Sequence, residues 1–262
     1  MQSITRDGVR LCYEEAGIGA PPMLLVHGFG GNHSHFAPQL DHFRRSHRVV
    51  AVDRRGHGES DKPTDPYTIA SFADDLAWLC DAIGLYQPVL VVHSMDAIGF
   101  DFAARYPDRL AALVLLDTPT FAPAPFVEAL AGAAAGMKSP AYLNVIRGFA
   151  DQAAFAPTDN PERKAHIVEG MSSLPQHVLA STLEQFLAYD RAETAARCQA
   201  PLLHIGAWFP ADLERLRTVC PQLQTARCVG TGHFAHLEAP DQVNAMIERF
   251  LAVALGRETV TA

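Results

Sequence analysis

The sequence predicts an α/β fold in which a mostly parallel sheet carries helices on both faces. The chain has 262 residues, of which 48% are hydrophobic and 19% charged, so it is long enough to bury a sizeable core. Short apolar runs alternate with longer helical patterns, which is typical of a parallel sheet covered on both faces. This rhythm breaks only between Leu116 and Leu202, where an insertion is expected.

An antiparallel hairpin is expected at the start of the sheet. Residues 4–11 read Ile-Thr-Arg-Asp-Gly-Val-Arg-Leu, and the pair Asp7-Gly8 is a signal for a two-residue hairpin turn. Five apolar runs follow, and each predicts a buried strand. They lie at residues 23–26, 49–52, 89–92, 112–116 and 202–205.

The break in the rhythm predicts an inserted helical cap. Residues 121–197 show helical periodicity without a strand run, and Pro123 and Pro125 punctuate its entry. The predicted domains are a core of residues 1–120 and 198–262 and a cap of residues 121–197. Ligands in open α/β sheets bind at the carboxyl ends of the strands, so we expect the cap to cover that edge. Its apolar candidates for lining a pocket are Phe121, Phe126, Met137, Tyr142, Phe149, Phe155, Met171 and Phe186.

The charge and the cysteines limit the partners. A net charge of -8 argues against a nucleic-acid or anionic-membrane partner, because both need a basic face. The five cysteines include no pair with CxxC spacing, which favours reduced thiols in a cytoplasm and no metal site. No signal peptide or membrane-spanning run is recognisable. We expect a small-molecule substrate and a monomer or homodimer.

The stretch Val-Val-His-Ser-Met-Asp-Ala-Ile-Gly, residues 91–99, places a serine between a strand and a helix. Ser94 is expected on a sharp turn that exposes its hydroxyl, with the Met95 N–H directed at the same space. The alternative is that Ser94 only caps the helix. Asp96 occupies a position where a tight turn favours a small residue. Its carboxylate favours the helix dipole but opposes a nearby developing oxyanion.

Two glycine-rich stretches supply further candidates. Residues 26–32, Val-His-Gly-Phe-Gly-Gly-Asn, follow the first parallel strand, and the Phe29 N–H could join that of Met95 in an oxyanion hole. An ordinary strand-to-helix turn is the alternative. Residues 230–240 place His233 on a loop before the last helix, in position for a general base.

These motifs resemble the α/β-hydrolase fold superfamily over nearly the whole chain. Residues 53–63, Asp-Arg-Arg-Gly-His-Gly-Glu-Ser-Asp-Lys-Pro, also look like the D-x-R-G-x-G-x-S loop of that family. The resemblance implies a Ser94 nucleophile, a His233 base and no cofactor or metal.

The triad acid departs from the usual pattern. Family members place an Asp three residues after the Gly that ends the strand at 202–205, and here Phe209 occupies that position in a shortened loop. Asp212 is interpreted first as a helix-start residue. Asp117 ends the strand after the nucleophile helix, where some haloalkane dehalogenases, a mycotoxin lactonase and the cofactor-free 2,4-dioxygenases carry the acid. We favour Asp117 over Asp212, although an Asp at this strand end is also common without a catalytic role.

The leading prediction is a serine hydrolase that cleaves a small apolar ester or lactone through an acyl-enzyme. The alternatives are a cofactor-independent dioxygenase of a hydroxyquinolone-like ring and a non-enzymatic small-molecule sensor. The candidates for substrate contact are His33, Phe121, Phe126 and Trp208.

Overall fold

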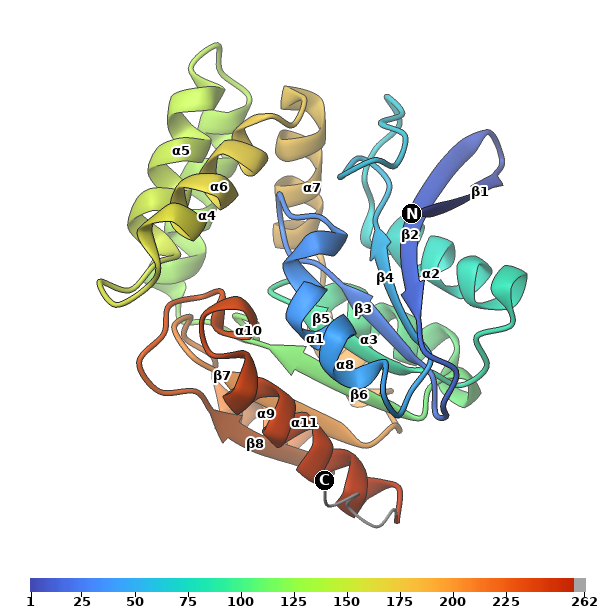
Figure 1. Cartoon of the computed structure of the whole chain (residues 1–262). Coiled ribbons are helices and arrows are strands. Elements are labelled where there is room, and N and C mark those ends of the chain that lie inside the picture. Colours follow the sequence, from blue (N-terminus) through green and yellow to red (C-terminus); the bar gives the residue numbers. More distant parts are fainter. Residues whose placement is uncertain (257–262) are drawn as a thin grey trace.

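The structure is a computed structural model that describes residues 1–256, and it is built on one eight-stranded sheet (Figure 1). The strand order is β1-β2-β4-β3-β5-β6-β7-β8, and all neighbours pair in parallel except β1 with β2 and β2 with β4. The strands are β1 (Gln2–Arg6), β2 (Val9–Ala16), β3 (Met23–Val26), β4 (Val49–Asp53), β5 (Val89–His93), β6 (Ala112–Leu116), β7 (Leu202–Gly206) and β8 (Leu223–Arg227).

The sheet confirms the predicted hairpin and all five predicted strands. Asp7 and Gly8 both have positive φ, 48° and 82°, which is the backbone that a two-residue turn between twisted strands requires. The sequence did not predict β8. That edge strand buries only part of its length and contains Gln224 and Arg227, so it has no apolar run.

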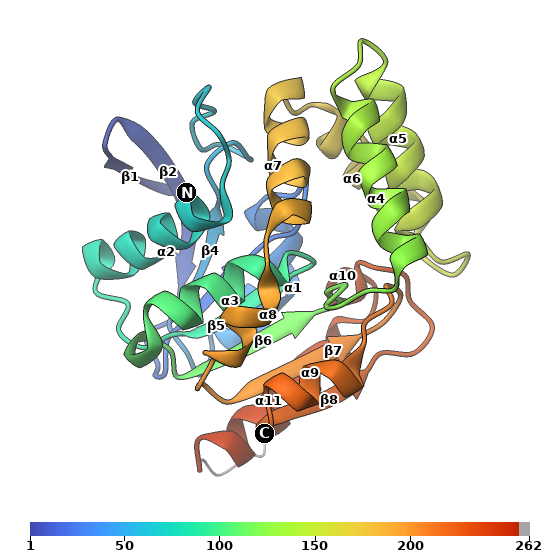
Figure 2. The ribbon, with the colours of Figure 1, turned by 180° about the vertical axis from the view of Figure 1, so that it is seen from behind.

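Helices cover both faces of the sheet (Figures 1 and 2). On one face lie α1 (Ala37–Phe43) and α11 (Pro240–Ala254), which pack against each other. On the other lie α2 (Ile69–Ile83), α3 (Asp96–Arg105), α8 (Arg191–Ala196) and α9 (Leu213–Val219). Short helices complete this layer structure: η1 (His33–Phe36), η2 (Pro107–Arg109) and α10 (Ala235–Glu238).

Four further helices stand apart from the two layers in the upper part of Figures 1 and 2. They are α4 (Ala124–Met137), α5 (Tyr142–Ala153), α6 (Pro161–Ser172) and α7 (Gln176–Ala188), all between β6 and β7. α8 also follows β6 but packs against α3 of the core. The cap boundary at residue 197 stays a prediction, and this packing favours a boundary before α8.

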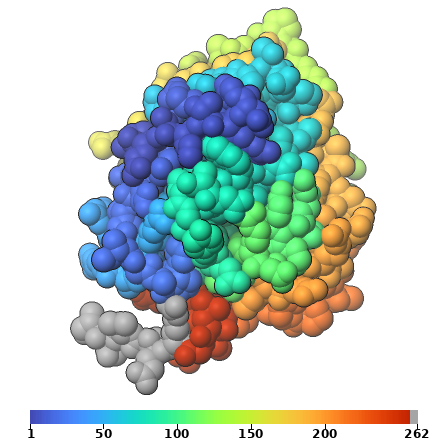
Figure 3. Space-filling view, turned by 90° about the vertical axis from the view of Figure 1, so that its right-hand side faces the viewer, coloured from blue at the N-terminus to red at the C-terminus, as the bar shows by residue number. Residues whose placement is uncertain are grey.

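The N-terminal hairpin is held against α2, and the two lie together on the face shown in Figure 3. Asp75 of α2 is buried and accepts two hydrogen bonds from Arg55, at 2.5 and 2.6 Å, and one from Arg6 of β1 at 3.2 Å. This ion pair joins β1, α2 and the loop after β4. Within residues 1–256, no helix is long and apolar enough to cross a bilayer.

Candidate active site

Ser94 lies on a sharp turn between β5 and α3. Its φ is +66°, a left-handed conformation that is rare for a residue with a side chain and is found at functional sites. The Met95 N–H donates to the His93 carbonyl at 2.7 Å and closes the turn. A Cβ on Gly28 would stand 2.9 Å from the Ser94 Cβ, so the loop after β3 approaches the serine closely only because residue 28 is glycine.

Asp117 and His233 form a buried pair. The Asp117 Oδ2 lies 2.7 Å from the His233 Nδ1, and both side chains are almost fully buried. The Asp117 Oδ1 accepts the backbone N–H groups of Ala207 at 2.7 Å and Trp208 at 2.9 Å, and the Phe209 N–H reaches both oxygens. These donors fix the carboxylate, and the carboxylate holds the Nδ1 proton of the imidazole, which leaves Nε2 unprotonated when the ring is neutral.

Phe209 and Asp212 do not approach the Nδ1 edge of His233. The Phe209 ring stacks on the imidazole with a centroid distance of 3.8 Å and an interplanar angle of 22°. Asp212 is exposed and caps α9, where its side chain accepts the Arg215 N–H at 2.9 Å. The interpretation of Asp212 as a helix-start residue is confirmed.

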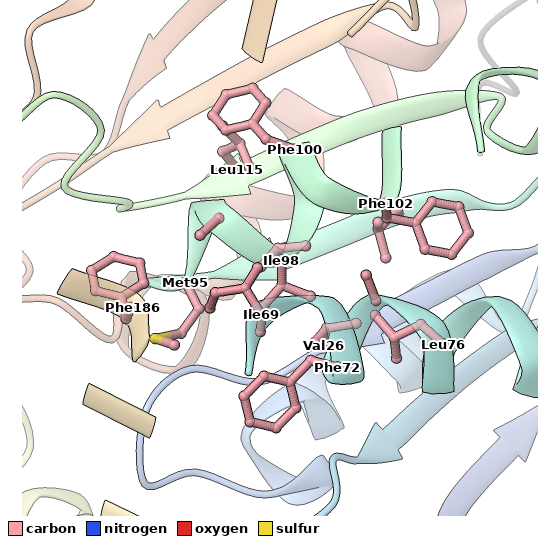
Figure 4. Close-up of a cluster of buried hydrophobic side chains, with 14 of the residues drawn as sticks. Val26, Ile69, Phe72, Leu76, Met95, Ile98, Phe100, Phe102, Leu115 and Phe186 are labelled. Carbon is pink, nitrogen blue, oxygen red and sulfur yellow. The ribbon is translucent and has the colours of Figure 1, made fainter. Parts of the chain in front are cut away.

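Ser94 and His233 line one cavity between the sheet and the cap. It encloses about 470 Å³ of space between atoms, including its open mouth. Core and cap both contribute to the lining. Figure 4 shows Met95 of the elbow, which is the sharp turn at residues 93–95, together with Phe186 of α7. The remaining lining residues are Phe29, Pro119, Leu130, Phe149, Ala154, Met171, Leu183, Phe209 and Phe234.

The comparisons with known proteins agree with this architecture. The family model described as "alpha/beta hydrolase fold" matches residues 21–160, more than half of the chain. The chain belongs to the α/β-hydrolase fold family. The matched part of this hydrolase contains the loop after β3, the elbow serine and Asp117, and it ends before His233.

Full-length relatives and solved structures of α/β-hydrolases extend the similarity to the rest of the chain. A protein from Caulobacter sp. (strain K31) named "Putative carbamate hydrolase RutD" is 28% identical, over 96% of this chain and 98% of its own length. The enol-lactonase from Burkholderia xenovorans LB400 matches 96% of this chain and 100% of its own with a TM-score of 0.86 at 24% identity. A thermophilic esterase from Thermogutta terrifontis matches 97% and 99%, with a TM-score of 0.84 at 26% identity.

None of the four predicted substrate contacts is among the residues that line the cavity of this α/β-hydrolase. His33 bonds the buried Asp53 through its backbone N–H at 2.6 Å and its Nδ1 at 2.9 Å, a contact that raises the pKa of its imidazole. The Phe121 ring lies 4.2 Å from the Arg215 guanidinium. These two side chains have structural partners outside the site.

Phe126 and Trp208 also lie outside the cavity lining. Phe126 contacts the lining residue Phe209 edge-on, with ring centroids 5.0 Å apart. Trp208 is 42% exposed, and its indole N–H donates to the Ala153 carbonyl at 2.8 Å. Its side chain borders a separate surface groove with Arg227. Its backbone N–H, which sequence reasoning did not consider, is the part that reaches Asp117.

Apolar cap residues line the cavity in place of the four candidates. Phe149, Met171 and Phe186 belong to the eight cap side chains considered from sequence, whereas Leu130 and Leu183 do not. All of these positions lie on helices α4–α7. Helical periodicity marks them as buried, but only the packing of the cap on the core decides which of them face the elbow.

Asp96 has a partner that the sequence did not reveal. Its carboxylate is fully buried, with Oδ1 accepting the Ala97 N–H at 2.8 Å and Oδ2 lying 3.5 Å from the Arg191 Nε. Arg191 stands at the start of α8 and also donates to the Phe186 carbonyl at 3.1 Å. The negative charge expected to oppose an oxyanion is therefore offset by a cation, and the pair ties the elbow helix to the end of α7.

Proposed function

We propose that this member of the hydrolase family is a serine hydrolase that cleaves small apolar carboxylic esters or lactones through an acyl-enzyme. The observation that carries the proposal is His233, which lies 2.7 Å from the Asp117 carboxylate and lines the same cavity as a serine with a φ of +66°. A structural serine that only capped α3 would need neither the strained turn nor a carboxylate-bound histidine beside it.

In the proposed reaction the Ser94 Oγ attacks the substrate carbonyl, and the His233 Nε2 takes its proton. Asp117 keeps the Nδ1 proton in place and stabilises the imidazolium that forms. The imidazolium then protonates the leaving alcohol, and a water attacks the acyl-enzyme with His233 acting as base again. Replacing any of the three groups removes a part of one shared step.

The oxyanion donors we propose are the backbone N–H groups of Phe29 and Met95. Both residues line the cavity, and within residues 1–256 the Phe29 N–H donates no hydrogen bond to the protein. The Met95 N–H already contacts the His93 carbonyl at 2.7 Å, so it would share its proton between two acceptors. We therefore assign the larger part of the stabilisation to Phe29.

The lining supports a neutral, apolar substrate. Apart from Ser94 and His233, every lining side chain is apolar, so a substrate carboxylate bound there would lose its hydration without gaining a cationic side chain. An esterase and a protein named as a carbamate hydrolase are among the similar proteins, and both names denote cleavage of a bond between a carbonyl and a heteroatom.

We propose a cytoplasmic monomer or homodimer, in keeping with five buried free thiols within residues 1–256.

A fluorophosphonate probe tests the nucleophile. The probe should label Ser94 in the wild type, label Ser94→Ala not at all and label His233→Ala very slowly, while Ser173→Ala, a change at an exposed cap serine, should react like the wild type. Turnover of aryl esters and acyl-homoserine lactones should be lost in the first two variants, and the double variant should lose little more. Hydroxyquinolone turnover that persists in Ser94→Ala would contradict the acyl-enzyme and favour the dioxygenase chemistry.

A further inference from the structure

Arg54, in the loop after β4, is a buried cation without an acidic partner. Its side chain is among the largest that are fully buried, and the residue is 2% exposed. Within residues 1–256 no carboxylate lies within ion-pair distance of it, and its Nε and Nη1 make no hydrogen bond. Removing a charge from water without pairing it costs free energy, so we expect the buried guanidinium to have a role that offsets this cost.

Within the described part of the chain, the one hydrogen bond of the Arg54 side chain goes to the loop beside Ser94. Its Nη2 donates to the Gly28 carbonyl at 2.8 Å, while the guanidinium stacks over the Phe72 ring at 4.7 Å. The same carbonyl oxygen lies 2.9 Å from the His27 Nδ1. Because the Arg54 backbone N–H donates to the His27 Nε2 at 3.2 Å, the neutral ring carries its proton on Nδ1 and donates to Gly28.

The peptide unit that receives these hydrogen bonds also carries the proposed oxyanion donor. The Gly28 carbonyl and the Phe29 N–H belong to one peptide group, and in a trans peptide they point in opposite directions. Donors gathered at the carbonyl, with a weaker third one from the Gly31 N–H at 3.2 Å, therefore fix the direction of the Phe29 N–H. Arg54 itself is not among the residues that line the cavity, so it does not contact substrate.

We propose that Arg54 is a positioning residue that orients and polarises the Gly28–Phe29 peptide, so that the Phe29 N–H becomes a stronger oxyanion donor. A hydrogen bond from a cation withdraws electron density from the carbonyl, and hydrogen bonds in such a chain strengthen one another. The positive charge also stands behind the peptide, on the side away from the developing oxyanion, and water does not screen it there. Burial lowers the pKa of Arg54 to about 9, so the guanidinium remains charged at neutral pH.

Arg55 provides the matched control, because it is the next residue and has an ordinary structural partner. It binds the Asp75 carboxylate through two hydrogen bonds and, among the described residues 1–256, makes none to the loop after β3. Loss of its charge should lower the midpoint of thermal unfolding and leave turnover unchanged. Loss of the Arg54 charge should lower turnover and leave the midpoint nearly unchanged, because an apolar side chain of similar length replaces a buried, unpaired charge at little cost in stability.

The experiment measures kcat and KM for p-nitrophenyl butyrate and the thermal midpoint in four variants: Arg54→Met, Arg54→Gln, Arg54→Lys and Arg55→Met. The inference rests on the proposed function, so Ser94→Ala is assayed beside them. We expect Arg54→Met to lower kcat about tenfold, less than the roughly 10²–10³ that loss of an oxyanion donor costs, with little change in KM or in the midpoint. Arg54→Lys should recover most of the loss and Arg54→Gln less of it, because only lysine restores the charge.

Three results would overturn the role of Arg54. They are an unchanged kcat in a folded Arg54→Met protein, a parallel fall of kcat and the thermal midpoint, and a rescue by Gln equal to that by Lys. If Arg54→Met does not fold, the order of Lys and Gln decides alone. An active Ser94→Ala protein would instead overturn the proposed function, so the two failures are distinguishable.

Discussion

The ends of β6 and β7 lie side by side, yet they contribute different groups to the site. β6 ends at Leu116 and is followed at once by Asp117, whose side chain binds His233. β7 ends at Gly206 and is followed by three residues that turn their backbone N–H groups toward the same carboxylate. One strand end supplies a carboxylate beside His233, and its neighbour supplies the backbone donors that hold this carboxylate.

This difference explains why Phe209 can replace the usual acid. With Asp117 already at the Nδ1 edge of the imidazole, the side chain of residue 209 covers the flat face of the ring instead. Phe126 packs edge-on against it. The loop after β7 thus positions the histidine through an aromatic contact and positions the acid through its backbone.

The largest effect is expected from an attempt to move the acid back to β7. Asp117→Asn combined with Phe209→Asp should stay about 10⁴ below the wild type in kcat/KM, which is the loss that an Asp-to-Asn change causes in a Ser-His-Asp protease. The reason is geometric, because a carboxylate at residue 209 would face the ring plane and not the Nδ1 proton. The matched control is Asp117→Asn with Phe209→Asn. Recovery of more than about tenfold over that control, or about 1.4 kcal/mol, would contradict the claim that a carboxylate at residue 209 cannot serve His233.

A smaller effect is expected when the pH is lowered, because within residues 1–256 the histidines around His233 have no carboxylate partner of the kind that Asp117 provides. His93 and His236 have ring centroids 4.3 Å apart, and His35 faces Phe234. Burial lowers the pKa of all three, that of His35 to about 4. Below pH 6.5 these histidines become protonated in the unfolded chain but stay neutral in the folded protein. Their contribution to the free energy of unfolding is therefore fully present above pH 6.5 and is lost as the pH drops toward 4.

His35 alone should account for about 3 kcal/mol between pH 6.5 and 4. The measurement is the free energy of unfolding from urea titrations between about pH 7 and 5. His35→Phe should reduce its slope with pH, and His177→Gln, a change at an exposed histidine, should not. A free energy that stays constant over this range would contradict the assignment of these rings as buried and neutral.

The smallest effect concerns the second acid near β7. Asp212→Ala should cost about 1 kcal/mol of stability, because it removes the N-cap of α9. Arg215→Ala, which keeps the backbone N–H that Asp212 accepts, is the control and should cost less. A change in kcat/KM without a change in stability would show that Asp212 serves the site.

The sequence predicted those features that depend on local pattern and chain order. The apolar runs predicted five strands, the Asp7-Gly8 pair predicted the hairpin, and the absence of an acid at residue 209 directed attention to Asp117. Each inference used residues that are close in sequence or a known order of motifs.

The sequence could not predict contacts that depend on how distant elements pack. Arg191 is far along the chain from Asp96, and the Arg54–Gly28 bond joins two loops that meet only because β3 and β4 are neighbours. Trp208 is a predicted substrate contact, but its side chain is 42% exposed and its indole N–H donates to the Ala153 carbonyl. Side-chain direction in a loop is set by the tertiary fold, not by residue type.

The claim that the acid follows β6 and not β7 is tested most directly by kcat/KM for Asp117→Asn and Asp212→Asn on one ester that the wild type hydrolyses. In Asp117→Asn the amide oxygen can keep the backbone donors, but the amide NH₂ faces the His233 Nδ1 and forces the ring proton onto Nε2. We therefore expect a loss of about 10⁴ for Asp117→Asn, the cost of the wrong tautomer, and activity close to wild type for Asp212→Asn. An inactive Asp212→Asn protein, or wild-type activity in both variants, would contradict the assignment of the acid to the end of β6.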